Sequence, residues 1–266
     1  MDLSLNAERF SGNKYVNLYN RFRPSPPKEI LQLSLNYLGK TKAASIIDLG
    51  CGTGISTKSW TPYAKKITGI EPSNEMIEIA IDNTNSPNIK YISGYASNIP
   101  VPSNNADIVT CSQSFHWMEP KSTLKEVNRV LKKEGVFVLY DIIWPPSVNC
   151  EYENAYNELF DNITSITQNI NQQISNKWDK KKHLLNIKNS NYFSFIKETF
   201  FHKTDILSTE QLIGIALSQG GLEALLKLGF SENEIGLNNF IKKVKKMKIT
   251  PYKKITYNYR AIFAIK

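Results

Sequence analysis

Three alternating glycines follow a short apolar segment in the first quarter of the chain. Residues 46–54 read IIDLGCGTG, so Gly50, Gly52 and Gly54 come directly after the apolar residues. Glycine tolerates positive φ and, because it has no Cβ, lets a ligand approach the backbone closely. In open parallel sheets, ligands bind beyond the carboxyl ends of the strands. We therefore expect these glycines to line a ligand site; a plain glycine turn is the alternative.

Two acidic residues flank this glycine loop in the sequence. Asp48 ends the apolar segment, where its carboxylate can receive an ammonium group directly or through water. Glu71 follows a second apolar segment, seventeen residues beyond Gly54, where an acid can accept hydrogen bonds from both hydroxyls of a ribose. The spacing is G-x-G-x-G and not the G-x-G-x-x-G that holds a dinucleotide pyrophosphate. The pattern favours a cationic ligand with an amino-acid tail and an adenosine.

Short segments rich in β-branched residues alternate with helical patterns in the first half of the chain. The patterns predict helices over residues 27–38, 74–81 and 124–131, and strands over 43–49, 67–70, 89–92, 107–111 and 136–140. Such alternation gives a mostly parallel sheet with helices on both faces, the doubly wound α/β class. Residues 151–250 change to helical spacing, and two last strands are expected over 199–205 and 257–265.

These motifs carry a resemblance to a known family. Residues 46–54 together with GIEPSNEMI at 69–77 resemble the first two cofactor motifs of class I S-adenosylmethionine-dependent methyltransferases. Residues 94–117 and 129–140 are similar to the later motifs of the methyltransferase 11-type group. FSGNKYVNLYNRFRP at 10–24 resembles the trans-aconitate methyltransferase-like subgroup. The resemblance covers about half of the chain and implies a seven-stranded Rossmann-like methyltransferase fold with S-adenosylmethionine as cofactor and S-adenosylhomocysteine as product.

The resemblance also implies roles in cofactor binding for particular residues. The three glycines would line the methionine moiety, and Glu71 would hold the ribose. Met76 would cover one face of the adenine; the alternative is an ordinary core methionine on an amphipathic helix.

The third motif departs from the family. The family commonly has Gly-Asp-Ala there, with the acid on the adenine amino group, whereas this chain has Tyr95 at the acid's position. Ala96 and Ser97 would then meet the adenine edge through backbone groups. Gln113, after the fourth predicted strand, resembles a family position close to the cofactor sulfur.

Candidate residues for the acceptor side are fewer: Tyr19, Arg23 and Trp117 are expected at the substrate or in the lid. His116 is a possible general base for a hydroxyl acceptor; the alternative is a histidine that fixes the loop and packs against Trp117. Tyr19 and Arg23 are four residues apart, hence on one side of a helix, and the arginine can pair with a carboxylate of the cofactor tail or of an acidic substrate. A surface arginine without such a role is the alternative. His183 and His202 lie in unmatched sequence and are taken as structural or exposed.

Metal, disulfide and membrane sites are not expected. The three cysteines, Cys51, Cys111 and Cys150, stand far apart with no histidine at ligand spacing. Methyl transfer from a sulfonium requires no metal. The first ten residues lack the apolar core of a signal peptide, and the longest apolar run, residues 136–144, is too short to span a bilayer. We expect a cytoplasmic, unanchored protein, a monomer or weak homodimer.

The positive charge is concentrated at one end of the sequence. Residues 241–266 hold eight lysines and one arginine with no acid, which equals the net charge of +9 of the whole chain. Such a segment can contact nucleic acid or an anionic membrane, but Ile241, Val244 and Met247 recur at the spacing of an amphipathic helix.

The predicted organisation follows from these patterns. We expect an N-terminal lid and first helix over residues 1–40, a cofactor-binding core over 41–145, a helical insertion and strand six over 146–250, and a final strand over 251–266. The insertion would roof the acceptor pocket.

The expected activity is methyl transfer from S-adenosylmethionine to an oxygen or nitrogen of a small molecule, with a carboxylate-bearing acceptor among the candidates. A nucleic-acid methyltransferase is disfavoured because residues 112–115 read SQSF and lack the Pro-Pro-Tyr element of the amino-methylating DNA enzymes. A nicotinamide-dependent dehydrogenase has the wrong glycine spacing. A cofactor-binding protein without catalysis remains open.

Overall fold

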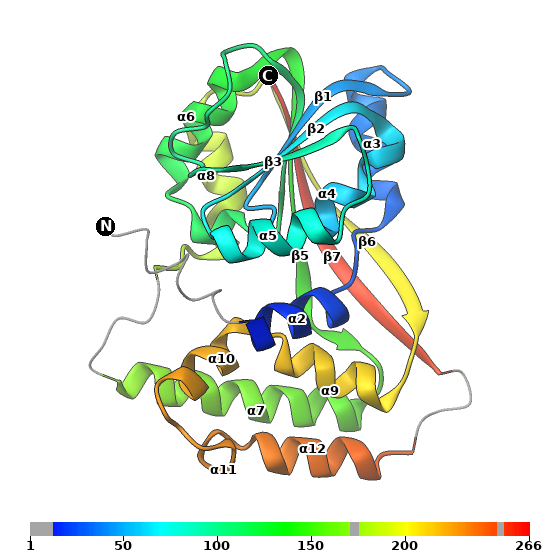
Figure 1. The fold of residues 1–266 in the computed structure, drawn as a ribbon, viewed down its shortest axis with the longest axis vertical. Helices are drawn as coiled ribbons and strands as arrows, with labels where there is room; N and C mark the ends of the chain where they lie inside the picture. Colours follow the sequence, from blue (N-terminus) through cyan, green and yellow to red (C-terminus); the bar gives the residue numbers. More distant parts are fainter. Residues whose placement is uncertain (1–12, 171–175, 249–252) are drawn as a thin grey trace. The chain divides into compact units, whose positions relative to one another are not determined.

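The computed structural model describes residues 13–170, 176–248 and 253–266 (Figure 1). The chain divides into two compact units. The sheet unit consists of Ser25–Ile142, Lys177–Phe201 and Tyr259–Lys266, and the helical unit consists of Met1–Pro24, Ile143–Asn176 and His202–Asn258. The predicted bounds, 1–40, 41–145, 146–250 and 251–266, differ from the bounds of these two units, and they stay a prediction.

A seven-stranded sheet contains the predicted strands. Its strands are β1 (Ala43–Leu49), β2 (Ala64–Glu71), β3 (Ile89–Ser93), β4 (Ala106–Ser112), β5 (Leu131–Ser147), β6 (Phe195–Ile206) and β7 (Lys254–Ile265). The order is β3-β2-β1-β4-β5-β7-β6. Strand β1 pairs in parallel with both β2 and β4, β2 with β3, and β4 with β5. The chain order therefore reverses between β1 and β4, which is where ligands bind in doubly wound sheets.

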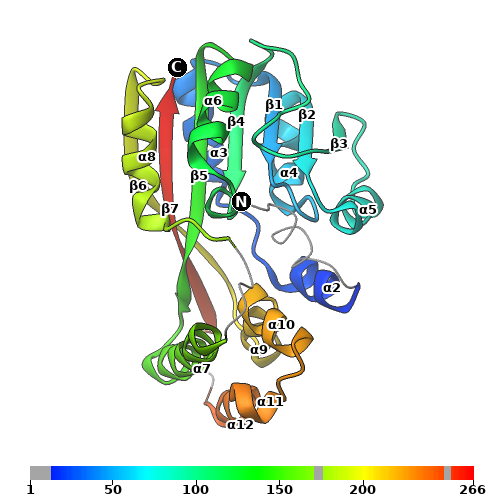
Figure 2. The same cartoon turned by 90° about the vertical axis from the view of Figure 1, so that its left-hand side faces the viewer.

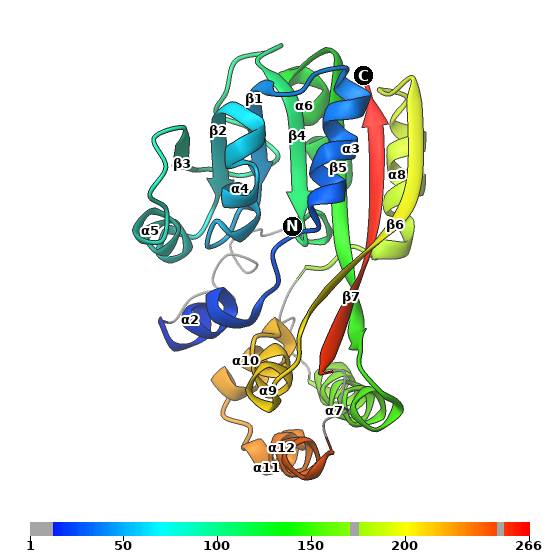
Figure 3. The same ribbon diagram turned by 90° about the vertical axis from the view of Figure 1, so that its right-hand side faces the viewer.

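Helices cover both faces of the sheet in the sheet unit. Figures 2 and 3 show α3 (Lys28–Leu38) and α4 (Ile55–Ser59) on one face, and α6 (Pro120–Val130) and α8 (His183–Ser190) on the other. Apolar side chains between α6, α8 and the strands form a buried cluster that includes Val109, Leu124, Phe137 and Ile187. Burial on both faces explains why the inner strands read as continuous apolar runs.

Local signals set the ends of the helices next to the site. Helix α3 ends at Leu38, and the left-handed conformation of Gly39 (φ 68°) lets the N–H of Lys40 reach the Leu35 carbonyl at 3.1 Å. Helix α5 (Asn74–Asp82) begins after Ser73, whose hydroxyl accepts the N–H of Met76. Helix α6 begins four residues before the predicted start because the Glu119 side chain accepts two backbone N–H groups and Pro120 occupies the first helical position.

The helical unit holds six helices in the described part of the chain. They are α2 (Asn13–Phe22), α7 (Cys150–Asn169), α9 (Thr209–Leu217), α10 (Gly220–Lys227), α11 (Glu232–Ile235) and α12 (Leu237–Lys246). Helices α2 and α9 pack closely, since a Cβ added to Gly214 would lie 2.3 Å from the ring of Phe22. Helix α7 confirms the predicted long helix.

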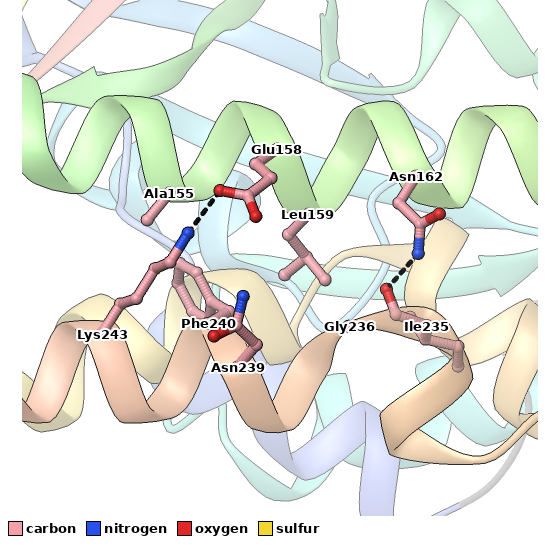
Figure 4. Close-up of a pocket in the computed structure, with 9 residues that line it drawn as sticks. All are labelled: Ala155, Glu158, Leu159, Asn162, Ile235, Gly236, Asn239, Phe240 and Lys243. Atoms are coloured by element: carbon pink, nitrogen blue, oxygen red, sulfur yellow. Dashed lines mark hydrogen bonds and ion pairs between the residues drawn. The ribbon is translucent and has the colours of Figure 1, made fainter.

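Helix α12 accounts for part of the basic segment. It buries Leu237, Phe240 and Val244 and leaves its lysines on the other side, which is the amphipathic arrangement. A pocket of about 250 Å³ lies between α7 and α12 (Figure 4). In it, Lys243 pairs with Glu158, and Asn162 donates to the carbonyl of Ile235, so these three side chains already have partners. Within the described ranges, no helix has the length and apolar character of a membrane span.

Candidate active site

The glycine loop connects β1 to α4 in a conformation that requires glycine. Gly50, Gly52 and Gly54 have φ values of 63°, 55° and 79°, a region that side chains with a Cβ rarely adopt. The loop is also crowded, because a Cβ on Gly50 would lie 2.6 Å from the Cβ of Ser114. The Gly50 N–H donates to the Ile70 carbonyl at 2.8 Å. The loop is thus held against the ends of β2 and β4.

Glu71 lies at the end of β2 beside this loop. Its Oε2 accepts the N–H of Gly52 and its Oε1 accepts the N–H of Ser73, both at 3.1 Å. The side chain is buried, and burial raises its pKa to about 7 although the two N–H groups act in the opposite direction. Each carboxylate oxygen has a further lone pair, so the group can accept hydrogen bonds from a diol while the backbone holds it in place.

Asp48 lies on the other side of the loop, near the end of β1. It is fully buried, and its Oδ2 accepts the hydroxyl of Thr57 at 2.7 Å. Its Oδ1 has no hydrogen-bond partner among the described residues. Burial raises the pKa of Asp48 to about 7, and the nearby charge of Glu71 adds to the effect. Burial disfavours the charged forms of both carboxyl groups, and a bound cation would stabilise these charged forms.

The proposed adenine residues lie at the same edge of the sheet. Met76 is buried on α5, and its sulfur would be 3.4 Å from a Cβ added to Gly52. The N–H of Gly94 donates to the carbonyl of Glu71 at 3.2 Å, which brings the start of the third motif to the end of β2. Ala96 and Ser97 follow and are half-buried, whereas Tyr95 is 40% exposed. The family's acid has no replacement at Tyr95.

The segment after β4 runs past the glycine loop. Gln113 has a positive φ of 56°, and its N–H donates to the Tyr140 carbonyl at 2.9 Å. Its side-chain Nε2 is buried and lacks a hydrogen-bond partner in the described structure. Ser114 donates its hydroxyl to the Leu49 carbonyl at 2.6 Å. Gln113 therefore brings an unused donor to the carboxyl edge between β1 and β4.

His116 lies in a short 3₁₀ helix, η2 (Phe115–Trp117), and is buried. Its ring packs on Trp117 with centroids 4.7 Å apart, as the structural interpretation expected. Its Nδ1 lies 3.6 Å from Oδ1 of Asp141 in β5. Burial and the charge of Lys180 lower the pKa of His116 to about 3, so the imidazole is neutral at pH 7.

Sequence reasoning missed three partners of His116. Asp141 lies inside β5, one residue beyond Tyr140, which pairs with the last residue of β4; it receives the Lys180 ammonium at 2.7 Å and faces His183 at 3.9 Å. Asp141 directly follows the predicted strand over residues 136–140, so the rule that sites lie at carboxyl ends of strands could have found it. His183 and Lys180 come from the segment that starts α8 and carry no such signal. His202 is exposed, as expected.

Tyr19 and Arg23 lie in the helical unit. The Arg23 guanidinium is 4.9 Å from the ring centroid of Tyr19 and 5.0 Å from that of Trp144. Its Nη2 donates to the Ser218 carbonyl and to Oε1 of Gln219, both at 2.8 Å. Its Nε is buried and has no partner among the residues described. Trp117, the third expected acceptor residue, belongs to the sheet unit.

Part of the chain is similar to known methyltransferases. Residues 47–139 match the family model of a methyltransferase domain. A protein of Saccharomyces cerevisiae named as a probable S-adenosylmethionine-dependent methyltransferase, CRG1, is 29% identical over 136 residues, which are 49% of this chain and 46% of that protein. The C-methyltransferase of ubiquinone and menaquinone biosynthesis from Campylobacter jejuni, UbiE, is 29% identical over 150 residues, 48% of this chain and 63% of that protein. The chain spans about half the length of the first curated relatives it matches.

A solved structure extends the likeness of the fold beyond the methyltransferase domain. A protein from Anaeromyxobacter dehalogenans, proposed to be a type II methyltransferase, superposes with a TM-score of 0.64 at 14% identity and covers 92% of this chain and 97% of its own. The predicted Rossmann-like methyltransferase fold is therefore confirmed. The family match and the named relatives support an S-adenosylmethionine-dependent methyltransferase, and the trans-aconitate subgroup receives no support from them.

Proposed function

We propose that this chain transfers a methyl group from S-adenosylmethionine to a small-molecule acceptor. The observation that carries the proposal is the pair of buried carboxyl groups next to the glycine loop: Asp48 lies at the end of β1 just before the loop, and Glu71, at the end of β2, accepts the N–H of Gly52 in the loop. The ligand combines a sulfonium and an ammonium with a ribose, and it therefore matches two carboxylates for which the described residues provide no ion-pair partner. The match of residues 47–139 to a methyltransferase domain supports the same ligand.

Each residue of the site has a distinct task in this proposal. Asp48 would receive the ammonium directly or through water, because its Oδ1 has no other partner among the described residues. Glu71 would accept both ribose hydroxyls. Met76 would cover the adenine, and Ala96 and Ser97 would contact its edge through backbone groups.

The residues after β4 would position the reacting atoms. The bound ligand supplies a methyl group on a positively charged sulfur, and the protein has to align the acceptor and exclude water. Gln113 would contact the ligand near the sulfur. His116 stays the candidate base for a hydroxyl acceptor, although a pKa of about 3 makes its imidazole a weak base in the ligand-free protein. An amine acceptor that is already uncharged needs no base.

A carboxylate-bearing acceptor, as in the trans-aconitate methyltransferase-like subgroup, is the finer proposal. Arg23 would bind it, because planar guanidinium groups pair with carboxylates through parallel hydrogen bonds. Its Nε and the Nε2 of Gln219 are both buried donors without partners within the described residues. The two side chains are joined through Nη2 of Arg23 and Oε1 of Gln219, so both unused donors belong to one hydrogen-bonded pair.

Isothermal titration calorimetry tests the first step. We expect heat of binding with S-adenosylmethionine and S-adenosylhomocysteine and none with NAD⁺. A chain that binds neither sulfur compound at millimolar concentration overturns the proposal. Glu75, exposed in the first turn of α5, provides a control position for variants of Glu71.

Product formation tests the second step. S-adenosylhomocysteine release is followed by mass spectrometry with a panel of acids, their amides, phenols, amines and a short duplex DNA. Release that depends on a small acceptor supports the proposal, whereas release only with DNA supports the nucleic-acid alternative that the basic segment over residues 241–266 suggests. Tight cofactor binding without release for any acceptor favours a binding protein.

A further inference from the structure

A second group of titratable side chains lies beyond the cofactor residues in the sheet unit. His116 comes from η2 after β4, Asp141 from inside β5, and His183 from the first turn of α8. Their relative exposures are 6%, 6% and 0%. One ligand atom from each side chain lies within 4.8 Å of the others. This is the single such group of three among the residues that the structure describes.

Three ring nitrogens of this group have no hydrogen-bond partner. His116 Nδ1 and both ring nitrogens of His183 are buried without one in the described part of the chain, whereas Asp141 Oδ1 has the Lys180 ammonium at 2.7 Å. A buried polar atom that lacks a partner destabilises the fold. Because such atoms are rare in native proteins, three of them beside a buried carboxylate indicate that a group which binds nitrogen and oxygen belongs between them.

We propose that His116, Asp141 and His183 form a binding site for a divalent transition metal such as Zn²⁺. Two imidazoles and one carboxylate are the donor set that zinc and ferrous iron take in proteins, with open positions for other ligands. Magnesium and calcium prefer oxygen ligands alone and are not expected here.

The distances are close to those of a metal site. His116 Nδ1 is 3.6 Å from Asp141 Oδ1, and His183 Nε2 is 3.9 Å from Asp141 Oδ2. Ligand atoms of a tetrahedral zinc site lie about 3.4 Å apart when the bonds are about 2.0–2.1 Å. Each histidine faces its own carboxylate oxygen, so a small inward movement of the two rings would bring all three side chains onto one ion.

The Lys180 ammonium lies where it would compete with a metal ion for the carboxylate of Asp141. Its ammonium lies 2.7 Å from Asp141 Oδ1, and its side chain is 35% exposed. The backbone around it is fixed, because Trp178 donates its N–H to the His116 carbonyl at 2.9 Å and Arg260 donates to the Lys180 carbonyl at 2.7 Å. The ammonium can therefore move into solvent while the chain that carries it stays in place. In this proposal Lys180 neutralises Asp141 when the metal is absent and is displaced when it binds.

The site shares His116 with the proposed methyl transfer, because the same imidazole is the candidate base there and a bound metal would occupy its Nδ1. His116 follows Gln113 and Ser114, which border the glycine loop. A metal there would act as a Lewis acid toward an oxygen of a bound acceptor. The chain has three histidines in all, so His202, exposed on β6 and bonded to Asn258, is the only one left as a control.

Metal content and affinity test the proposal on the full chain. The protein is stripped with a chelator, loaded with Zn²⁺ or Co²⁺ and desalted; metal is then measured by mass spectrometry, and cobalt coordination by visible absorption. We expect one metal ion per chain in the wild type and in His202→Leu. His183→Leu, which keeps an apolar side chain in the buried position, should weaken zinc binding on the order of 100-fold or more.

Lys180 gives the result that distinguishes a metal site from a structural ion-pair network. Lys180→Met removes the competing cation and should strengthen zinc binding by about tenfold, whereas Lys182→Met should leave it unchanged. Asp141→Asn and His183→Gln serve as second variants if His183→Leu does not fold by circular dichroism. Wild type and Lys180→Met that both retain less than a tenth of an ion per chain overturn the proposal. Titration of the metal-free protein with S-adenosylmethionine tests the cofactor site separately, so either idea can fail alone.

Discussion

Oε2 of Glu71 accepts the N–H of Gly52 at 3.1 Å, so the last residue of β2 is joined to the middle of the glycine loop after β1. The same carboxylate accepts the N–H of Ser73, at the start of α5. One side chain thus fixes the loop, the strand end and the helix start around the position proposed for the ribose.

Glu71→Gln should weaken the binding of both S-adenosylmethionine and S-adenosylhomocysteine. The amide keeps the shape but loses the charge and one acceptor, and hydrogen bonds to charged groups are worth about 1.5–3 kcal/mol. Calorimetry should show the dissociation constant rise by about tenfold to a hundredfold. Glu75→Gln, exposed on α5, is the matched control; equal affinities of the two variants would contradict the ribose assignment.

Gly50→Ala should destabilise the protein more than Gly39→Ala does. Both glycines have a positive φ, 63° and 68°, so both alanines carry the left-handed strain of about 1–2 kcal/mol. Only at Gly50 does the new Cβ meet other atoms, with Ser114 at 2.6 Å, while nothing lies within 4 Å at Gly39. Overpacking adds about 1–3 kcal/mol, which the difference between the two unfolding free energies in urea should show. Equal losses would mean that the loop moves away from Ser114.

The contribution of Asp48 to the stability of the ligand-free protein should fall as the pH rises from about 4 to about 7. The folded-state pKa of Asp48 is raised from 3.8 to about 7, so over this range the folded protein keeps a proton that the unfolded chain has lost. The contribution is complete below the unfolded pKa and is lost as the pH passes through the folded one. In urea, the stability of the wild type relative to Asp48→Asn should decrease over this range. A constant difference would contradict the raised pKa.

Cofactor binding should show the opposite dependence on pH. The proposed ligand requires Asp48 and Glu71 to be ionised, and both have pKa values of about 7. Affinity should therefore increase as the pH rises from 6 to 8, and binding at pH 6 should release protons. Calorimetry in two buffers with different ionisation enthalpies measures this release; binding without it would argue against a cation at these carboxylates.

Arg23→Lys should reduce turnover of a carboxylate acceptor about tenfold to a hundredfold, because lysine replaces neither the paired hydrogen bonds nor the stacking on Tyr19 and Trp144. The ratio of kcat/KM for an acid to that for its amide is the measurement. Arg21→Lys, in the last turn of α2 two residues before Arg23 but exposed and paired with Glu210, should leave the ratio unchanged. A preferred acceptor without a carboxylate would refute the finer proposal.

Local sequence signals account for most of the sheet. Strand β1 spans Ala43–Leu49 as predicted, because an apolar run that ends in glycines needs no distant information. Strand β5 extends to Ser147, seven residues past the predicted end. Asp141 and the two prolines after Trp144 read as the end of a strand, and only pairing within the folded sheet overrides that signal.

Local sequence signals likewise predict one part of the candidate site and miss another part. Asp48, Glu71 and the glycines could be predicted because they lie at or just after the ends of predicted strands, and Asp48 and Glu71 are 23 positions apart. The contact between Asp141 and His183 joins residues 42 positions apart in the chain, and no periodicity reports such a contact. The sequence also does not predict the positive φ of Gln113, since this conformation is uncommon for a residue with a side chain.

Trp117 is placed to serve as an optical reporter of its surroundings. The centroid of its ring lies 4.7 Å from the ring centroid of His116 and 4.9 Å from the ammonium nitrogen of Lys177. Indole emission responds to nearby charge and to a protonated imidazole, so any event that alters the electronic state of His116 should change this signal. The chain has four tryptophans; replacing the other three by phenylalanine would leave a single fluorophore beside the histidine, readable in a cuvette without a label.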